Sequence, residues 1–588
     1  MRAKALVQAV ASTSLINALA LTGAYAQGTA PSASGEPEVL ALEEVVVTAN
    51  RRTENVQRVP IAVTAFSAES ALAHGITDMQ SLANAVPGVR IDRATATALP
   101  FIRGVGSAVG QVSAEPPIAF YVDDVYIPAA GAALSNFNSV DSLEVAKGPQ
   151  GTLFGRNATG GVIQVFTKNP TQEPALDVSL GYGNYDTKTG SFYATGGLSD
   201  TLSANIAAYG GDQGSGWGDN PTTGKDAFET NKYYGGRVKL LWEPSDATSV
   251  LFNLDHDNTK SSQGFYGPVK GTVGAGGLYA PPDDYYDLVD HMDPYWRVKQ
   301  TGGSVKITQE LNNFGKLVSV SAYRDSEQQQ HWDQSGAPFP LVPVDIKGPT
   351  KTFTQELQLL SQDDSAVTWI AGLFYMHDES GYDPLKFTGP LAGLLSGGTA
   401  SFIQSETEQK TDSYAAFAQV NWEIFDATHL TLGARYTIDE REITGRVNFG
   451  DALIVDAPNS GRDDKWKKPS WRIALDHQFT DDFMAYVAYN RGFKSGTFNA
   501  VLFPLPGVPL SDPVEPETLD AYTIGQKAEF FDNRIRVNSE VFYYKYKDMQ
   551  LTSIVAGGTA LKNAAEATIK GIDVDITATL FQGFTLTA

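Results

Sequence analysis

The chain has 588 residues, of which 42% are hydrophobic and 19% are charged, and its formal net charge is −23. A chain of this size can bury a large core or several cores, whereas so acidic a chain repels the phosphate backbone of nucleic acids. We therefore expect no nucleic-acid partner. Cysteine is absent, which excludes disulfide bonds, a catalytic thiolate and thiolate metal ligands.

The first residues have the pattern of a secretory signal peptide. Arg2 and Lys4 precede a mostly apolar stretch, and Ala24-Tyr25-Ala26 fits the small-x-small rule of a cleavage site. A transmembrane helix is the alternative, but polar residues interrupt the run. We predict a signal peptide over residues 1–26, and no later window approaches the ~20 apolar residues of a membrane helix.

Residues 27–54 are mostly polar, and a single β-branched run interrupts them. The segment LEEVVVTAN, Leu42 to Asn50, has the composition of a strand. The residues before it are rich in Gly, Ala, Ser, Pro and Glu, which cannot bury enough apolar surface to fold. The sequence therefore shows an extended, sticky segment without an evident neighbour.

The stretch 55–170 mixes helical and strand patterns. The helical pattern is AESALAHGITDMQSLANAVPGV, and short strands are indicated by AFYVDDVYIP, SLEVAKG and GVIQVFTK. This mixture favours a small α+β domain.

Residues 171–588 settle into strands of alternating polarity. In THLTLGARYTID, one face carries Leu430, Leu432, Ala434, Tyr436 and Ile438, and the other carries polar side chains. Short polar turns alternate with long polar insertions, so the long insertions should all lie at one end of an up-and-down sheet, as in outer-membrane barrels. The long insertions are 211–231, 258–296, 328–350, 377–410, 440–467 and 495–519.

The same alternation would suit a soluble sandwich, in which the apolar rows pack between two sheets. Charges in the cleanest strands keep to the polar face, which a lipid-facing barrel requires because Arg or Lys at mid-bilayer costs about 2–4 kcal/mol. We predict a mainly β protein, a transmembrane antiparallel β-barrel with an N-terminal α+β plug domain in its lumen. About 16 strands are present, and we expect about 22 in a complete barrel, since FTLTA begins another strand where the sequence stops.

Three stretches carry a family resemblance. IRGVGSA (102–108), IAFYVDDVYIP (118–128) and SLEVAKGPQGTLFGRNATGGVIQVFTKNP (142–170) together resemble the plug of a TonB-dependent outer-membrane receptor of the ferric-siderophore-receptor-like branch. The resemblance implies a plug over 55–170 and a barrel over 171–588. It also implies that 27–54 is a periplasmic segment, in which LEEVVVTAN occupies the place of the TonB box.

The TonB box is the segment that pairs with an inner-membrane energy-transducing protein. An extended peptide of this kind can add to an exposed sheet edge; the alternative is an ordinary first strand of the plug. The predicted TonB-binding residues are Glu44, Val45, Val46, Val47, Thr48 and Ala49.

The plug motif also follows from local chemistry. Pro149 suits the first position of a short helix and Gly155 its C-terminal end. Arg103 and Arg156 are expected in a polar interface between plug and wall, paired with wall carboxylates, because an unpaired buried charge is costly; the alternative is simple solvation. The predicted structural motif comprises Arg103, Gly104, Gly148, Pro149, Gly151, Gly155, Arg156, Gly160 and Gly161.

Catalytic interpretations are weak. Asp123-Asp124 fits a hairpin tip better than a pair of catalytic carboxylates, and RGVGSAVG follows no βαβ unit. The seven histidines show no metal-site spacing, and His256 fits one face of a strand. We predict no enzyme activity, no catalytic residues, no metal and no cofactor.

The resemblance implies TonB-dependent active transport of a scarce ligand across the bacterial outer membrane. An iron–siderophore complex is the favoured ligand; cobalamin, haem, an oligosaccharide or an aromatic compound remain alternatives, as do a passive pore and a secreted soluble β-protein. The implied partners are the TonB protein, outer-membrane lipid and lipopolysaccharide, and the protein should be a monomer without a transcription-signalling extension. Substrate-binding residues are unknown, although plug loops 96–100 and 107–115 should face the rim with the long loops.

Overall fold

The structure is a computed structural model. It describes residues 42, 44–134, 136–229, 232–265, 279, 282–363, 365–456, 462–500, 513–555, 558–563, 566–581 and 583–588. The predicted signal peptide lies outside the described residues, and so does the whole stretch 27–41.

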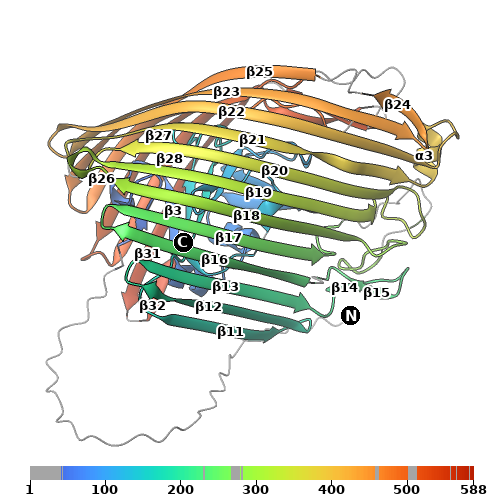
Figure 1. Cartoon of the computed structure of the whole chain (residues 1–588), viewed down its shortest axis with the longest axis horizontal. Helices are drawn as coiled ribbons and strands as arrows, with labels where there is room; N and C mark the ends of the chain where they lie inside the picture. The colour runs from blue at the N-terminus through green and yellow to red at the C-terminus, as the bar shows by residue number, and fades with distance from the viewer. Residues whose placement is uncertain are drawn as a thin grey trace, which may run out of the picture. The chain divides into compact units, whose positions relative to one another are not determined.

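One antiparallel sheet forms the wall of the molecule, and Figure 1 shows its strands side by side. In the part of the chain that the structure describes, this sheet has 18 strands. They are β11 (Ala175–Gly183), β12 (Thr187–Ser199), β13 (Leu202–Gln213), β16 (Lys232–Ser245), β17 (Thr248–Ser261), β18 (Tyr295–Glu310), β19 (Lys316–Asp333), β20 (Pro343–Leu360), β21 (Val367–Thr388), β22 (Phe402–Phe425), β23 (Thr428–Phe449), β24 (Ala452–Asp456), β25 (Arg462–Thr480), β26 (Phe483–Lys494), β27 (Glu517–Phe530), β28 (Ile535–Lys547), β31 (Ala567–Phe581) and β32 (Phe584–Thr587).

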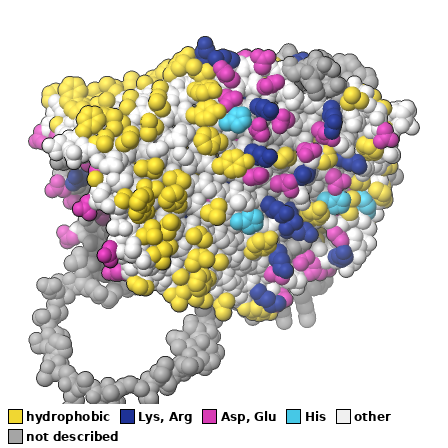
Figure 2. Space-filling view, viewed as in Figure 1, with side chains coloured by type: hydrophobic (Ala, Val, Ile, Leu, Met, Phe, Trp, Pro, Cys, Tyr) yellow, Lys and Arg dark blue, Asp and Glu magenta, His cyan; other side chains and the backbone are white. Residues whose placement is uncertain are grey.

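The two faces of the wall differ in polarity as the sequence predicts. On β23, Leu432 and Tyr436 are 46% and 49% exposed, whereas Arg435 and Asp439 on the opposite face are buried. Figure 2 shows the outward apolar side chains gathered in a broad band along one side of the wall. No second sheet packs on this face of β23 among the described residues, so the sandwich alternative is wrong.

The strands are longer than predicted at one end. The predicted loops 328–350, 377–410 and 440–467 shrink to 334–342, 389–401 and 450–461, because the flanking strands continue into them. On β22, for example, Glu406 and Glu408 lie on one face and Thr407 and Gln409 on the other. Beyond the apolar band both faces are polar, so these extensions show no alternation in the sequence.

Connections of two lengths alternate along the wall, as predicted. Short turns such as 246–247 and 426–427 lie at one end, and connections such as 262–294 and 495–516 lie at the other; the turn 184–186 is a short exception at the second end. We call these the short-turn end and the long-loop end. The connections contain β14 (Gly218–Asn220), β15 (Lys225–Ala227), β29 (Gln550–Val555), β30 (Gly558–Asn563), α3 (Pro390–Leu395) and η4 (Asn312–Phe314).

Residues 44–167 form the plug, whose blue elements lie between the front and back strands of the wall in Figure 1. Its largest sheet has the order β3-β9-β10-β7-β8, and smaller sheets are β4-β5-β6 and β1-β2. The elements are β1 (Val46–Val47), β2 (Glu54–Asn55), η1 (Val56–Arg58), β3 (Val63–Ser67), α1 (Ala68–Ala73), α2 (Met79–Ala85), β4 (Val89–Ala94), β5 (Thr97–Ile102), β6 (Val105–Gly106), β7 (Ile118–Val122), β8 (Val125–Tyr126), η2 (Ala132–Leu134), β9 (Val140–Lys147) and β10 (Gly161–Thr167).

Both plug helices begin at side-chain caps. The Ser67 hydroxyl accepts from Ser70 N at the start of α1, and Asp78 and Ser81 form a reciprocal capping box on α2. Buried apolar residues of β7, β9 and β10, such as Ile118, Val145 and Val162, form the plug core. Within the described ranges, every helix is too short or too polar to cross a membrane.

Candidate functional site

The segment Glu44–Ala49 lies against the plug near the short-turn end. Val46 and Val47 form β1, which pairs antiparallel with Asn55 and Glu54 of β2. Val47 is fully buried, whereas Val46 is 46% exposed. The segment for which the sequence shows no neighbour therefore has one: it pairs with β2 over two residues of each strand.

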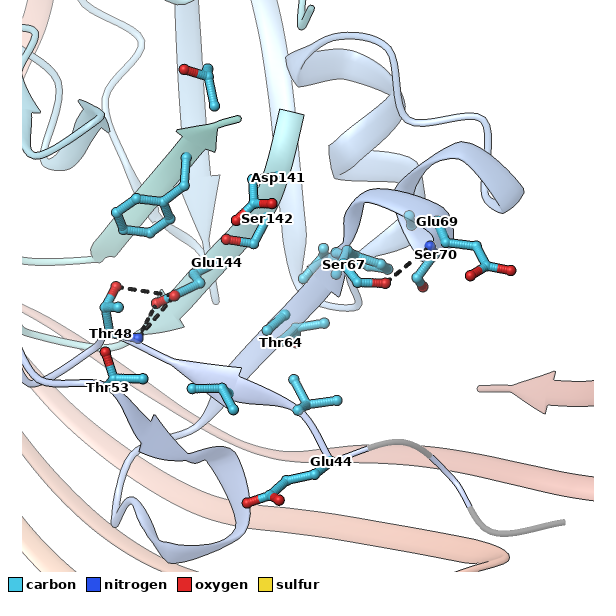
Figure 3. Close-up of a pocket in the computed structure, with 18 of the residues that line it drawn as sticks. Glu44, Thr48, Thr53, Thr64, Ser67, Glu69, Ser70, Asp141, Ser142 and Glu144 are labelled. Atoms are coloured by element: carbon cyan, nitrogen blue, oxygen red, sulfur yellow. Dashed lines mark hydrogen bonds between the residues drawn. The ribbon is translucent and has the colours of Figure 1, made fainter. Parts of the chain in front are cut away.

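Thr48 attaches the segment to the central sheet of the plug. Its backbone N donates to both carboxylate oxygens of Glu144 on β9, at 2.9 and 3.0 Å, and its hydroxyl donates to Oε1 at 3.0 Å. Figure 3 shows these contacts between two segments that are far apart in sequence. Burial raises the pKa of Glu144 to about 7, although the hydrogen bonds from Thr48 act in the opposite direction.

A cavity of about 1630 Å³ opens beside this contact. Its lining includes Glu44, Thr48 and Glu144, together with Ser67 and Glu69 at the start of α1 (Figure 3). Residues near the short turns of the wall, such as Arg536, line it as well. The segment thus borders open space on one side and the plug sheet on the other.

Arg103 lies in the interface between plug and wall. Its Nη1 donates to Glu540 Oε1 at 2.5 Å and to the Tyr544 hydroxyl at 2.8 Å, and its Nε donates to Asp573 Oδ2 at 2.6 Å. The guanidinium also stacks over Phe542. Burial alone lowers the pKa of Arg103, but Tyr544, Glu540 and Asp573 raise it above its ordinary value, so the side chain stays charged.

Arg156 lies in a second charged cluster. Its Nη2 donates to Glu115 Oε1 at 2.9 Å, and its Nη1 is 3.8 Å from Asp439 Oδ2 on β23. Arg441 of the wall donates to the other oxygen of Glu115 at 2.7 Å. The nearest carboxylate of Arg156 therefore belongs to the plug, and Glu115 joins both arginines.

Most motif glycines lie where neighbours leave no room for a side chain; at Gly104 there is room, and its φ of +78° is what favours glycine. Gly155 has φ +81°, and a Cβ there would come within 2.6 Å of Arg435 Nη2. The predicted helix at Pro149 is a single helical turn, closed by Gly155 N donating to Gly151 O at 3.1 Å. The remaining motif residues are Gly104 and Gly148, both with positive φ, Pro149 and Gly151, which pack against Gly492 of β26, and Gly160 and Gly161, which pack against Ile118 and Ala146.

Asp123 and Asp124 form the turn of the hairpin β7–β8, as predicted, and both have positive φ. Asp123 accepts from Thr167 N at 2.8 Å, and Lys306 of the wall donates to Asp124 at 2.7 Å. Burial raises the pKa of Asp124, but Lys306 and Arg51 outweigh it and hold the pKa below its usual range. These carboxylates are therefore structural ion-pair partners.

One plug hairpin and one plug loop reach the long-loop end. The predicted loop 96–100 lies almost wholly in strand β5, so only the turn 95–96 before it is irregular. The hydroxyl of Thr95, beside the predicted loop 96–100, bonds Gln330 of β19. In the loop 107–115, Gln111 Nε2 donates to Asn499 Oδ1 at 2.7 Å and Val112 N to the Tyr382 hydroxyl at 3.3 Å. Gln111 is buried and contacts Asn499 and Ala500 just after β26, whereas Gly110 beside it is exposed.

The described residues include no group of three or more His, Asp or Glu side chains placed to hold a metal ion. His256 lies on the exposed face of β17, where its Nδ1 is 2.8 Å from the Thr301 hydroxyl.

Sequence reasoning missed Glu144. Its signal is weak but present, since an acidic residue interrupts the apolar stretch Leu143–Ala146 of a buried strand, where an unpaired carboxylate would be costly. The partner, Thr48, is too distant in sequence to be inferred from any local pattern.

Two family descriptions match the chain. The one described as "TonB dependent receptor-like, beta-barrel" matches residues 131–588, and the one described as "TonB-dependent Receptor Plug Domain" matches residues 55–162.

Relatives and solved structures agree with the match. The pesticin receptor of Yersinia enterocolitica is 24% identical over 95% of this chain and 78% of its own length. The vitamin B12 transporter BtuB of Vibrio vulnificus is 24% identical over 92% of this chain and 84% of its own. The crystal structure of the ferric yersiniabactin uptake receptor FyuA of Yersinia pestis superposes with a TM-score of 0.77 at 22% identity, over 90% of this chain and 78% of that one. The chain belongs to the TonB-dependent receptor family.

Proposed function

We propose that the protein imports a ferric siderophore across the bacterial outer membrane, driven by the TonB protein of the inner membrane. Residues 1–26 are the export signal, 27–54 a periplasmic segment with the TonB box at Glu44–Ala49, 55–170 the plug and 171–588 the barrel. The short-turn end faces the periplasm and the long-loop end faces outward. The protein acts as a monomer and catalyses no covalent step.

One observation carries the transport proposal: the plug fills the lumen and is tied to the wall by buried charges. Arg103 pairs with Glu540 and Asp573 at one place, and Lys239 of the wall pairs with Asp123 at another. Removing one partner of a buried ion pair costs about 3–5 kcal/mol, so a bulky solute does not pass by diffusion alone. A passive pore is therefore disfavoured, and passage requires work on the plug.

The position of Glu44–Ala49 supports its role as the segment through which the TonB protein exerts force on the plug. The segment borders the cavity at the short-turn end and is held by the β1–β2 pairing, the Thr48–Glu144 hydrogen bonds and the burial of Val47 and Ala49. An extended peptide that leaves this place can add as a strand to the sheet of a partner protein.

The ligand assignment rests on the relatives. A pesticin receptor and a ferric yersiniabactin uptake receptor match most of the chain, and the second name specifies a ferric complex. The match to a vitamin B12 transporter supports cobalamin as the second candidate. The ligand would bind at the long-loop end, above the turn 95–96 that precedes β5 and the plug loop 107–115.

The test is uptake in a strain that lacks its own copy of the gene. Cells expressing the full-length protein take up radiolabelled iron from one or more ferric siderophores, and deletion of Glu44–Ala49 abolishes uptake while ligand binding to cells persists. A deletion of equal length within residues 29–40 serves as the matched control and keeps uptake.

Three outcomes would contradict parts of the proposal. Undiminished uptake after deletion of Glu44–Ala49 would indicate a passive pore. Uptake of labelled cyanocobalamin but of no ferric siderophore would replace the ligand. Recovery of the protein in the soluble periplasmic fraction would remove the outer-membrane location.

A further inference from the structure

The chain that follows the segment Glu44–Ala49 is bound to the wall. The buried Arg52 donates from Nη1 to Ser361 O at 3.0 Å and from Nη2 to Trp369 O at 2.7 Å. Its Nη2 also donates to Ser361 Oγ at 3.0 Å, and its Nη1 contacts Asp363. These acceptors lie in or beside the turn that joins β20 to β21, at the short-turn end. One plug side chain thus binds a turn of the wall.

Two cations of the wall bind the same stretch of chain from another place. Lys527 of β27 donates from Nζ to Val56 O at 2.6 Å, and Arg472 of β25 donates from Nη2 to Pro60 O at 2.7 Å. Both side chains are buried. In the sheet order, β22 and β23 separate β21 from β25, so the stretch is held at two separate places on the wall. We call residues 51–60 the wall anchor.

The attachment is mutual. Burying a cation is costly unless hydrogen bonds compensate for its lost hydration. Lys527 and Arg472 find this compensation at the carbonyls of Val56 and Pro60, and Arg52 finds it at carbonyls of the wall. Moving the wall anchor away would therefore remove acceptors from three buried charges at once.

The segment Glu44–Ala49 is held differently. Thr48 depends on the single side chain of Glu144, which belongs to the plug. The rest of the segment pairs with β2, and Val56 N donates to Val45 O at 2.8 Å. Because β2 and Val56 belong to the wall anchor, the segment lies on a strand that is itself fixed to the wall.

The boundary between the two kinds of attachment lies at Asn50. Directly after it, the guanidinium of Arg51 lies over the Phe154 ring of the plug and 3.5 Å from Glu356 of the wall. Figure 3 shows Thr53, within the wall anchor, with strands of the wall in pale red beside it.

We propose that the wall anchor stays in place when Glu44–Ala49 leaves the plug. The released chain then ends at Asn50, and β2 remains as the template on which the segment pairs again. Arg52, Arg472 and Lys527 are positioning residues, since they act through the chain that they hold. The proposal rests on the proposed role of Glu44–Ala49 as the TonB box and names the residues that limit its release.

The wall anchor separates release of the segment from opening of the plug. With the anchor in place, loss of the Thr48–Glu144 contact frees the segment alone. Without the anchor, the same event would free ten further residues, which span about 35 Å when extended. Release would then reach β3, the edge strand of the central plug sheet.

The test measures how far along the chain release extends. It uses the full-length protein in a neutral detergent, and the absence of native cysteine permits single-thiol reporters. Val47→Cys reports on the segment and Val59→Cys on the wall anchor, because these positions are 0% and 1% exposed. Val162→Cys, fully buried in the plug core, reports on general loosening of the plug. Glu144→Ala releases the segment, and maleimide labelling rates are compared with and without it.

We expect Glu144→Ala to accelerate labelling of Val47→Cys. It should change labelling of Val59→Cys by less than about twofold, since independent sites add within about that factor. Adding Arg52→Gln removes the plug side of the anchor. A hydrogen bond to a charged group corresponds to about 10- to 150-fold, so labelling of Val59→Cys should rise by about this factor in Glu144→Ala/Arg52→Gln.

The wall side of the anchor is tested by Lys527→Met, which keeps the side-chain length but cannot donate to Val56 O. In the Glu144→Ala background it should raise labelling of Val59→Cys to a similar degree. Arg58→Gln is the matched control, because Arg58 is exposed in the same stretch and makes none of the contacts described above; it should leave labelling unchanged. Arg52→Lys keeps the charge and should restore part of the protection.

Acceleration of Val59→Cys labelling by Glu144→Ala alone, as large as that of Val47→Cys, would show that release passes Asn50 and would overturn the proposal. The labelling uses neither TonB protein nor ligand, so it does not depend on transport. Uptake and ligand binding are measured separately in the same variants, and absence of uptake beside the expected labelling would count against the transport proposal alone.

Two further outcomes would also overturn the proposal. Equal effects of Arg52→Gln and Arg58→Gln would show that the wall contacts do not limit release. Labelling of Val162→Cys at the same raised rate as Val59→Cys would show that the whole plug leaves the wall, which contradicts a local anchor.

Discussion

The contact between Thr48 and Glu144 should control how often the segment Glu44–Ala49 leaves the plug. We consider Glu144→Ala, which removes the acceptor of the Thr48 backbone N and of the Thr48 hydroxyl. The comparison is best made at about pH 6, below the raised pKa of Glu144. The carboxyl is then mostly protonated, so the substitution removes hydrogen bonds without also removing a buried charge.

The size of the effect follows from the two donors. Each hydrogen bond contributes about 0.5–1.5 kcal/mol net, so their joint loss weakens the held state by about 1–3 kcal/mol. The ratio of released to held segment should rise roughly 5- to 150-fold, because about 1.4 kcal/mol corresponds to a factor of ten. The β1–β2 pairing and the burial of Val47 remain, so the held state should still be detectable.

The assay uses a single thiol in a chain that has no native cysteine. Val47→Cys places the thiol at a fully buried position, so its labelling by a maleimide requires release of the segment. The added Glu144→Ala change should accelerate labelling by the factor above. Glu69→Ala is the matched control, because Glu69 is exposed and lines the same cavity without contacting the segment. Equal labelling rates with and without Glu144 would refute the reasoning.

Three further predictions concern the same plug. Burial raises the pKa of Glu144 to about 7, whereas the hydrogen bonds from Thr48 lower it, so the contact that holds the segment favours the ionised carboxylate. Release should therefore become less favourable as pH rises through about 7: labelling of Val47→Cys, normalised to Val46→Cys, should fall, and Glu144→Gln should flatten the profile. Arg103→Ala leaves Glu540 without its cation and Asp573 with only the more distant Lys147, and should destabilise plug docking by about 3–5 kcal/mol, measured by protease sensitivity of the plug in the assembled protein. Gly155→Ala strains a residue at φ +81° and should lower the Tm measurably, since a non-glycine residue there costs about 1–2 kcal/mol.

The sequence predicts those parts of the fold that repeat. The alternation on β23 identifies its outward apolar row because its two faces differ in polarity, and this contrast is visible in every second residue. Where both faces of a strand are polar, this contrast disappears. The sequence pattern therefore predicts a loop, not a strand, for the extension of β22 around Glu406–Lys410.

The candidate site is less predictable, since its contacts join residues that no local pattern relates. The motif arginines were expected to meet wall carboxylates, and Arg103 does so at Glu540 and Asp573. Which carboxylate meets which arginine depends on how the plug rotates within the wall. Arg156 illustrates this, because its nearest carboxylate is Glu115 of the plug itself.

The central sheet of the plug connects the segment Glu44–Ala49 to the charged contact between Arg103 of the plug and Asp573 of the wall. Thr48 is attached to Glu144, and Lys147, farther along the same strand β9, lies 3.6 Å from Asp573 Oδ2, the carboxylate oxygen that also accepts from Arg103. Tension applied at Glu44–Ala49 first meets hydrogen bonds of about 1 kcal/mol each, and only afterwards the buried charges, whose disruption costs several times more. The weak contact should therefore yield before the plug moves, so a partner protein can take hold of the segment at equilibrium and needs an external energy source only for the second step.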